Sequence, residues 1–154
     1  MILKELEIKE NTSINNKIKK IHAQFSTIIT ELNDRKLSQN IENLAKESIN
    51  TINETALTGS SLFKLIKEKQ TQLIKELEKE MKIVPKNYYR NLWMLLGMSG
   101  IGLPLGVAFG LSVGNIGLLG LGLPFGMAIG AGIGTSMDKK AQKEGRQLQV
   151  EIKI

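Results

Sequence analysis

Two stretches, twenty residues apart, decide the fold: Gly100-Ile-Gly-Leu-Pro-Leu-Gly-Val-Ala-Phe-Gly110 and Gly120-Leu-Gly-Leu-Pro-Phe-Gly-Met-Ala-Ile-Gly130. Seven of the eleven aligned positions are identical, including the proline of each stretch. Self-similarity at a fixed period indicates that one structural unit has been repeated. The sequence therefore predicts two equivalent segments in this part of the chain.

Both stretches lie within residues 92–137, a block of 46 residues that contains none of the 21 basic and 15 acidic side chains of the chain. The block also holds 13 of the 15 glycines. A helix needs about 20 apolar residues to cross the hydrocarbon core of a bilayer. The block therefore predicts two membrane spans, near residues 92–113 and 116–137, joined by a turn at Gly114-Asn115.

Glycine recurs at every fourth position in each span, which on a helix produces a face without side chains. Such faces let two helix backbones approach closely in lipid. The predicted helix-packing residues are Gly102, Gly106, Gly110, Gly114, Gly122, Gly126, Gly130 and Gly134. Pro104 and Pro124 are expected either to kink their helices or to break them.

Aromatic and basic residues flank the uncharged block. Membrane-spanning helices carry Tyr and Trp at the level of the lipid headgroups, and Lys and Arg on the cytoplasmic side. The predicted interface residues are Tyr88, Tyr89, Arg90, Trp93, Lys139 and Lys140. Because both ends of the block are basic and the turn is uncharged, both termini are expected in the cytoplasm.

A soluble alternative exists, because glycine-rich apolar runs occur in fibrous assemblies and buried helices of soluble proteins can be apolar all round. A block of 46 uncharged residues would then need a soluble core larger than the other 108 residues could enclose. We therefore expect an integral membrane protein, in which residues 87–137 form the aromatic belt and the transmembrane hairpin.

Residues 1–86 are expected to form a cytoplasmic, coiled-coil-like domain of three amphipathic helices. The first has apolar residues at alternating steps of four and three, the spacing of a helical seam. This seam consists of Ile14, Ile18, Ile21, Phe25, Ile28 and Leu32. None of the three helices can bury its apolar stripe alone, so they pack on each other or on other subunits.

The basic tail, residues 138–154, ends in a stretch that alternates polar and apolar residues from Gln147 onward, as half-buried strands do. Leu6 and Ile8 alternate with charged residues near the other terminus. These two segments are candidates for a short β pairing, with two frayed tails as the alternative. The overall prediction is an all-α membrane protein with this pairing added.

The composition excludes several kinds of chemistry. The chain has no cysteine and one histidine, His22, which argues against thiolate or histidine metal sites and against most nucleophilic catalysis. No phosphate-binding glycine loop is present, since the Gly-x-Gly pairs lack the required spacing and context. The excess of positive charge lies beside the apolar block, so nucleic acid is not expected as a partner. We predict no enzymatic activity and no cofactor.

The segment from Gly97 to Arg146, with its paired Gly-x-Gly-Leu-Pro-x-Gly-x-Ala-x-Gly and its closing Gly-Thr-Ser-Met-Asp-Lys-Lys-Ala-Gln-Lys-Glu-Gly-Arg, resembles small bacterial membrane proteins of the glycine-zipper type. The likeness covers about a third of the chain. It implies a membrane hairpin with a basic cytoplasmic tail in a bacterial inner membrane, and it transfers no catalytic residue.

Two functions remain open from the sequence. The first is a non-enzymatic membrane anchor or scaffold, which associates with itself through its hairpin and its helical domain. The second is a pore or membrane-perturbing effector assembled from glycine-lined hairpins. The expected partners are the lipid bilayer, further copies of the chain and an unidentified protein bound by the helical domain.

Overall fold

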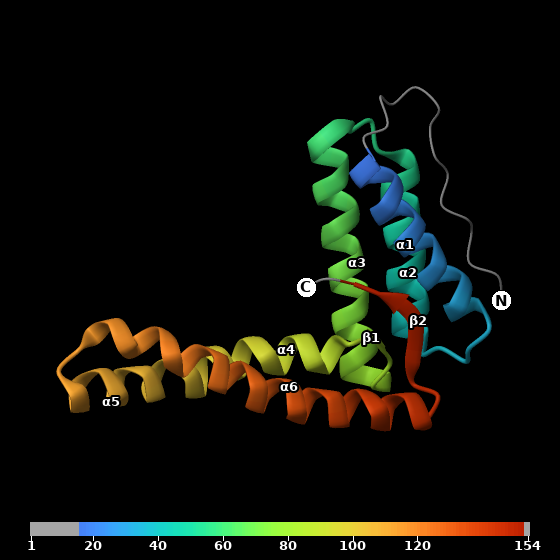
Figure 1. Cartoon of the computed structure of the whole chain (residues 1–154). Coiled ribbons are helices and arrows are strands. Elements are labelled where there is room, and N and C mark those ends of the chain that lie inside the picture. Colours follow the sequence, from blue (N-terminus) through green and yellow to red (C-terminus); the bar gives the residue numbers. More distant parts are fainter. Residues whose placement is uncertain (1–15, 153–154) are drawn as a thin grey trace. The chain divides into compact units, whose positions relative to one another are not determined.

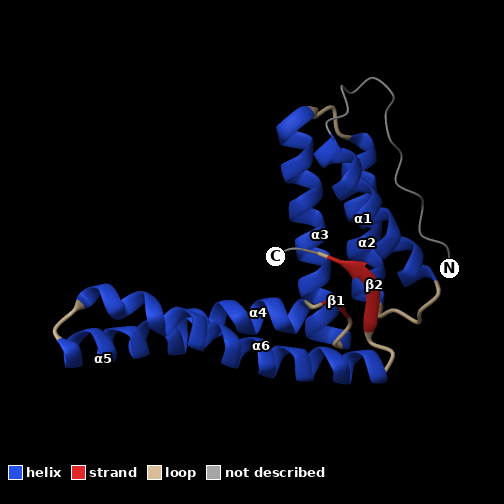
Figure 2. Cartoon of the chain, in the orientation of Figure 1, coloured by secondary structure: helices blue, strands red, loops and turns tan. Residues whose placement is uncertain are grey.

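A computed structural model describes residues 16–152 and shows a mostly helical chain, which confirms the predicted helical class. The chain divides into two compact units, Met1–Ile83 and Val84–Ile154. Figure 2 distinguishes the helices from two short strands. The elements are α1 (Asn16–Asn33), α2 (Gln39–Glu54), α3 (Gly59–Met81), β1 (Val84–Lys86), α4 (Tyr88–Gly97), α5 (Leu103–Val113), α6 (Leu119–Lys143) and β2 (Gln147–Glu151).

The first unit is a bundle of three helices that run alternately up and down, as Figure 1 shows. Helix α3 contacts both α1 and α2. The predicted seam of α1 faces the core, since Ile18, Ile21, Phe25, Ile28 and Leu32 are all buried, whereas Ile14 lies outside the described residues. The bundle therefore buries within one chain the apolar stripe that α1 could not bury alone.

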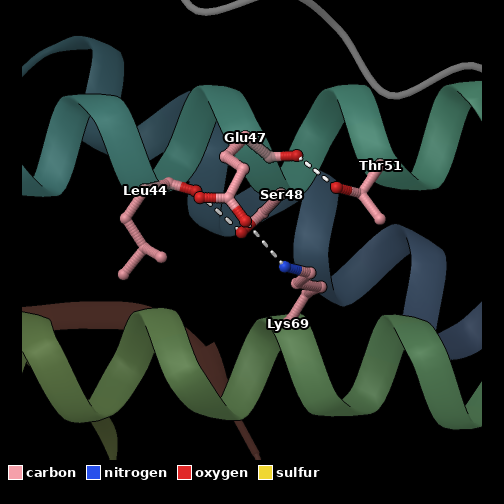
Figure 3. A network of polar contacts seen from close by, with 5 residues as sticks. All are labelled: Leu44, Glu47, Ser48, Thr51 and Lys69. Atoms are coloured by element: carbon pink, nitrogen blue, oxygen red, sulfur yellow. Dashed lines mark hydrogen bonds and ion pairs between the residues drawn. The ribbon is translucent and has the colours of Figure 1, made fainter.

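An ion pair links α2 to α3, and two hydrogen bonds nearby lie within α2 (Figure 3). The ammonium group of Lys69 on α3 lies 3.1 Å from a carboxylate oxygen of Glu47 on α2. The hydroxyl groups of Ser48 and Thr51 donate hydrogen bonds of 2.7 Å to the carbonyl oxygens of Leu44 and Glu47. Ser48, although fully buried, is thus satisfied within its own helix, and the core tolerates it.

The first turn of α2 is held to the last turns of α3. Ser38 caps α2 by accepting a hydrogen bond of 3.3 Å from the backbone N–H of Ile41. The Ser38 hydroxyl also donates to Glu80 at 2.5 Å, and the side-chain amide of Asn40 donates to the same carboxylate. These donors, Ser38 foremost, lower the pKa of Glu80 from its ordinary value.

The second unit contains two helices long and apolar enough to cross a membrane, as the sequence predicts. The first runs from Tyr88 to Val113 and consists of α4, a π-helical turn at Met98–Gly102, and α5. The second is α6, preceded by a 3₁₀ turn at Ile116–Leu118. At the end away from the turn both helices extend beyond the predicted spans, to Tyr88 and to Lys143, because charged residues continue each helix. Helix α6 meets no helix breaker until Gly145, whose φ is +69°.

The short sheet differs from the predicted pairing of the termini. Residues 147–151 form a strand, as expected, but its described partner is β1, which lies parallel to it. Val84 pairs with Gln147, and the backbone N–H of Val84 donates to the carbonyl of Arg146 at 3.0 Å. The N-terminal segment that contains Leu6 and Ile8 lies outside the described residues, so its pairing stays a prediction.

Candidate functional site

The candidate site is the surface along which the two apolar helices face each other. The helix Tyr88–Val113 and α6 lie side by side and antiparallel (Figure 1). The buried residues along this contact are mainly glycines, spaced by four residues except for a step of five from Gly97 to Gly102, which crosses the π-helical turn. They are Gly97, Gly102, Gly106 and Gly110 on the first helix and Gly122, Gly126, Gly130 and Gly134 on α6.

A methyl group on any of these glycines other than Gly110 would overlap the opposite backbone. A Cβ atom on Gly122 would lie 2.7 Å from the Cα of Gly106, and one on Gly126 would lie 2.7 Å from the Cα of Gly102. A Cβ atom on Gly130 would lie 2.7 Å from the carbonyl carbon of Trp93. Real Cβ contacts essentially never fall below 3.0 Å. Only glycine therefore permits this separation of the two helices.

Two roles are predicted for Gly114, in the turn and in the packed row, and the structure shows only the first. Gly114 ends α5 in the left-handed conformation, with a φ of +68°, and nothing lies within 4 Å of the Cβ position. Its backbone N–H and that of Asn115 both bond to the carbonyl of Gly110, which closes the helix end. Gly114 thus belongs to the turn between the helices, whereas Gly97, which is not among the predicted packing residues, belongs to the packed row.

The two prolines leave both helices unbroken. Pro104 stands in the first turn of α5, directly after the π-helical turn, and the backbone stays right-handed helical across Gly102 and Leu103. The π-helical turn is wider than an α-helical one, and it changes which carbonyl each N–H reaches. It therefore accommodates the ring of Pro104 and the backbone N–H that proline lacks. Pro124 lies inside α6, which runs without interruption from Leu119 to Lys143.

Asp138 joins the two helices at the end opposite the turn. Its side chain, 6% exposed, comes from α6, and its two oxygens accept hydrogen bonds from the backbone N–H groups of Tyr89 (3.1 Å) and Arg90 (2.9 Å). These N–H groups lie in the first turn of α4 and have no partner within the helix. The carboxylate therefore caps α4 from the neighbouring helix, where it also meets the positive end of the helix dipole.

The predicted interface residues gather at this same end. Tyr89 is buried against Val84 and Ala141, rather than exposed as expected of a belt residue, whereas Tyr88 and Trp93 are partly buried against that cluster. Arg90, Lys139 and Lys140 have exposed side chains. The aromatic residues thus contribute to the packing of this end of the hairpin, and the basic residues lie on its surface.

Within residues 16–152, no three His, Asp or Glu side chains gather where they could hold a metal ion. His22 lies beside Ile21 on the seam of α1 and is 9% exposed. Comparison with known proteins adds no assignment: no family model, no curated protein and no solved structure matches the chain.

Proposed function

We propose that the chain is a non-enzymatic integral membrane protein that acts as a self-associating anchor or scaffold. The hairpin from Tyr88 to Lys143 spans the bilayer, and the helical unit α1–α3 and both termini lie on the cytoplasmic side. The glycine rows hold the two spans together. The membrane is that of a bacterium if the likeness to glycine-zipper proteins reflects common ancestry.

The observation that carries this proposal is the apolar outer surface of the hairpin. Its large outward-facing side chains include Leu105, Phe109, Leu111, Phe125 and Ile129, which are between 36% and 73% exposed. Only 22% of each apolar window is buried, whereas the core helix of a soluble protein would be mostly buried. A surface of this kind in water would be a far larger apolar patch than soluble proteins expose.

The length of the helices also fits a bilayer. The 26 and 25 residues of the two helices span about 38 Å at about 1.5 Å per residue. This exceeds the hydrocarbon core of about 30 Å and approaches the full thickness with headgroups. When the Gly114 turn lies at one membrane surface, the Asp138 end therefore reaches the headgroup layer of the other.

A scaffold explains the hairpin better than a pore does. The hydroxyl groups of Ser99, Ser112 and Ser136 donate to carbonyl oxygens of their own helix, at 3.0, 2.8 and 3.1 Å. The spans therefore offer few polar groups to water, and the glycine rows, which could expose backbone, face each other within one chain. A pore would need several copies that expose backbone carbonyls elsewhere.

Single-cysteine labelling tests the placement in the membrane, because the chain has no cysteine of its own. Asn115→Cys at the turn is expected to react with a membrane-impermeant maleimide on intact spheroplasts. Gln142→Cys, exposed at the other end of the hairpin, is the matched control and is expected to react only after permeabilisation. Reaction of both positions only after permeabilisation, or recovery of the chain in the soluble fraction, would overturn the proposal.

Light scattering of the purified protein in detergent tests self-association. An oligomer is expected for the full chain, and the same measurement on residues 1–83, which contain a complete bundle core, shows which unit drives assembly. A monomer under both conditions would refute the scaffold. Leakage of dye from liposomes that contain the protein would instead support the pore.

A further inference from the structure

The end of the hairpin that holds Asp138 has an unbalanced charge. Four basic side chains lie at this end, and we call them the basic collar: Arg90 in the first turn of α4, and Lys139, Lys140 and Lys143 in the last two turns of α6. All four are exposed. Arg90 and the start of the lysine group are neighbours in space, because Asp138 binds the backbone N–H of Arg90 at 2.9 Å.

The acidic groups of the same unit are occupied elsewhere. Asp138 is buried and accepts two backbone hydrogen bonds. Glu144 is bound by Arg146, which lowers the pKa of Glu144, with a smaller contribution from Lys140. Glu151 accepts a hydrogen bond from Asn87 at 3.1 Å. Within residues 84–152, no member of the basic collar forms an ion pair.

The depth of the collar matches one layer of the bilayer. Lys139 lies twenty residues after the start of α6, and Arg90 lies twenty-three residues before the end of α5, so both are about 30 to 35 Å along the helices from the turn. That distance equals the hydrocarbon thickness, which places the collar among the headgroups. Trp93, partly buried one turn further along α4, marks the adjacent edge of the hydrocarbon.

We propose that the basic collar binds the headgroups of anionic phospholipids, and that this protein therefore gathers anionic lipid around its hairpin. The inference rests on the proposed membrane function. The headgroup is the expected ligand rather than a free anion in solution, because the collar lies at headgroup depth in the proposed hairpin. Each Lys or Arg near an anionic membrane surface increases association about fivefold.

Trp93, the only tryptophan, provides the assay. The full chain is placed in phosphatidylcholine bilayers in which a small fraction of the lipid is replaced by phosphatidylglycerol or phosphatidylcholine with brominated acyl chains. Quenching by the two brominated lipids gives the ratio of their association constants at Trp93. We expect a ratio of about five or more at low salt, falling toward one in 1 M salt, where charges are screened within about 3 Å.

Two variants with equal charge changes identify the residues responsible. Lys139→Gln, Lys140→Gln and Lys143→Gln together are expected to bring the ratio close to one. The matched control changes three exposed lysines of α3, Lys64→Gln, Lys67→Gln and Lys75→Gln, and is expected to leave it unchanged.

The outcomes separate the two proposals. Equal quenching by both lipids in the unaltered chain, or an unchanged ratio in the collar variant, would overturn the collar proposal alone. Absence of quenching by either lipid would refute the membrane hairpin itself, and with it the collar. Retained quenching by brominated phosphatidylcholine shows that a variant still inserts.

Discussion

The substitution Gly122→Ala tests whether close backbone contact stabilises the hairpin. The added Cβ would lie closest to the carbonyl oxygen of Gly102 and the backbone nitrogen of Gly106, and 2.7 Å from the Cα of Gly106, whereas ordinary contact begins at 3.4 Å. The helices must therefore separate by at least 0.7 Å (3.4 minus 2.7) at this point. A gap of 0.5 to 1 Å forfeits about a quarter to a half of the dispersion attraction between the atoms involved.

The expected loss is about 1–3 kcal/mol of hairpin stability, the usual cost of forcing extra atoms into a packed contact. The matched control is Gly132→Ala, because Gly132 lies on the same helix, is exposed and has nothing within 4 Å of its Cβ position. Alanine there is expected to be neutral or to stabilise by up to about 1 kcal/mol, since it favours the helix over glycine.

The assay is reversible unfolding in mixed micelles with increasing dodecyl sulfate, followed by the fluorescence of Trp93. This tryptophan is a suitable probe because its backbone touches Gly130 across the helix contact. A lower midpoint for Gly122→Ala than for Gly132→Ala is expected. Equal midpoints for the two variants would refute the reasoning, because the two substitutions differ only in what the new methyl group meets.

Three further predictions concern polar groups. Asp138→Ala should lower hairpin stability in the same assay by about 1–2 kcal/mol, the usual value of a helix N-cap, and Asp138→Asn should lower it less; no effect would contradict the cap. Gln70→Leu should raise the thermal stability of the bundle by about 1 kcal/mol, because the amide nitrogen of Gln70, 2% exposed, has no hydrogen-bond partner among the described residues. The control is Gln72→Leu at an exposed position of the same helix. A loss of stability in Gln70→Leu would argue against this reasoning. The pKa of Glu80 is lowered in the folded chain, so the ionised carboxylate stabilises the fold at pH values above its ordinary pKa near 4.5, and this stabilisation is lost as the pH falls through the lowered pKa. Glu80→Gln should therefore weaken the pH dependence of the melting temperature between about pH 5 and pH 3. An unchanged pH dependence in this variant would exclude the contact.

The helical arrangement could be read from the sequence because it depends on local pattern. The packed glycine row follows from a spacing of four that one helix displays by itself. Small residues also recur on another face, at Gly100 and Ala108 on one helix and at Gly120 and Gly132 on the other, but there they are eight and twelve residues apart and exposed. The denser row of glycines faces inward, since only glycine avoids overlap there.

The features that the sequence did not reveal depend on contacts between distant residues. Asp138 is a single acidic residue in a basic segment, and only the antiparallel pairing of the helices brings it to the N–H groups of Tyr89 and Arg90. The partner of β2 is equally hidden, because β1 has three residues, too few to display an alternating pattern, and contains Pro85. Tyr89 is buried for the same reason, since Ala141 reaches it from the end of α6.

The two ends and the middle of the hairpin hold it together in different ways, and this bears on how it would enter a membrane. At one end the turn at Gly114 and Asn115 joins the helices covalently, and at the other Asp138 joins them by hydrogen bonds. Between these points the glycine rows supply backbone contact. The apolar 18-residue window of the second helix has a mean hydropathy of 1.3, against 1.8 for that of the first, so the second gains less from lipid by itself. Because lipid provides no hydrophobic force between helices, close packing and polar links must supply the difference. The weaker second helix therefore depends on the first, and both glycine substitution and loss of Asp138 should reduce insertion of α6 more than that of α4 and α5.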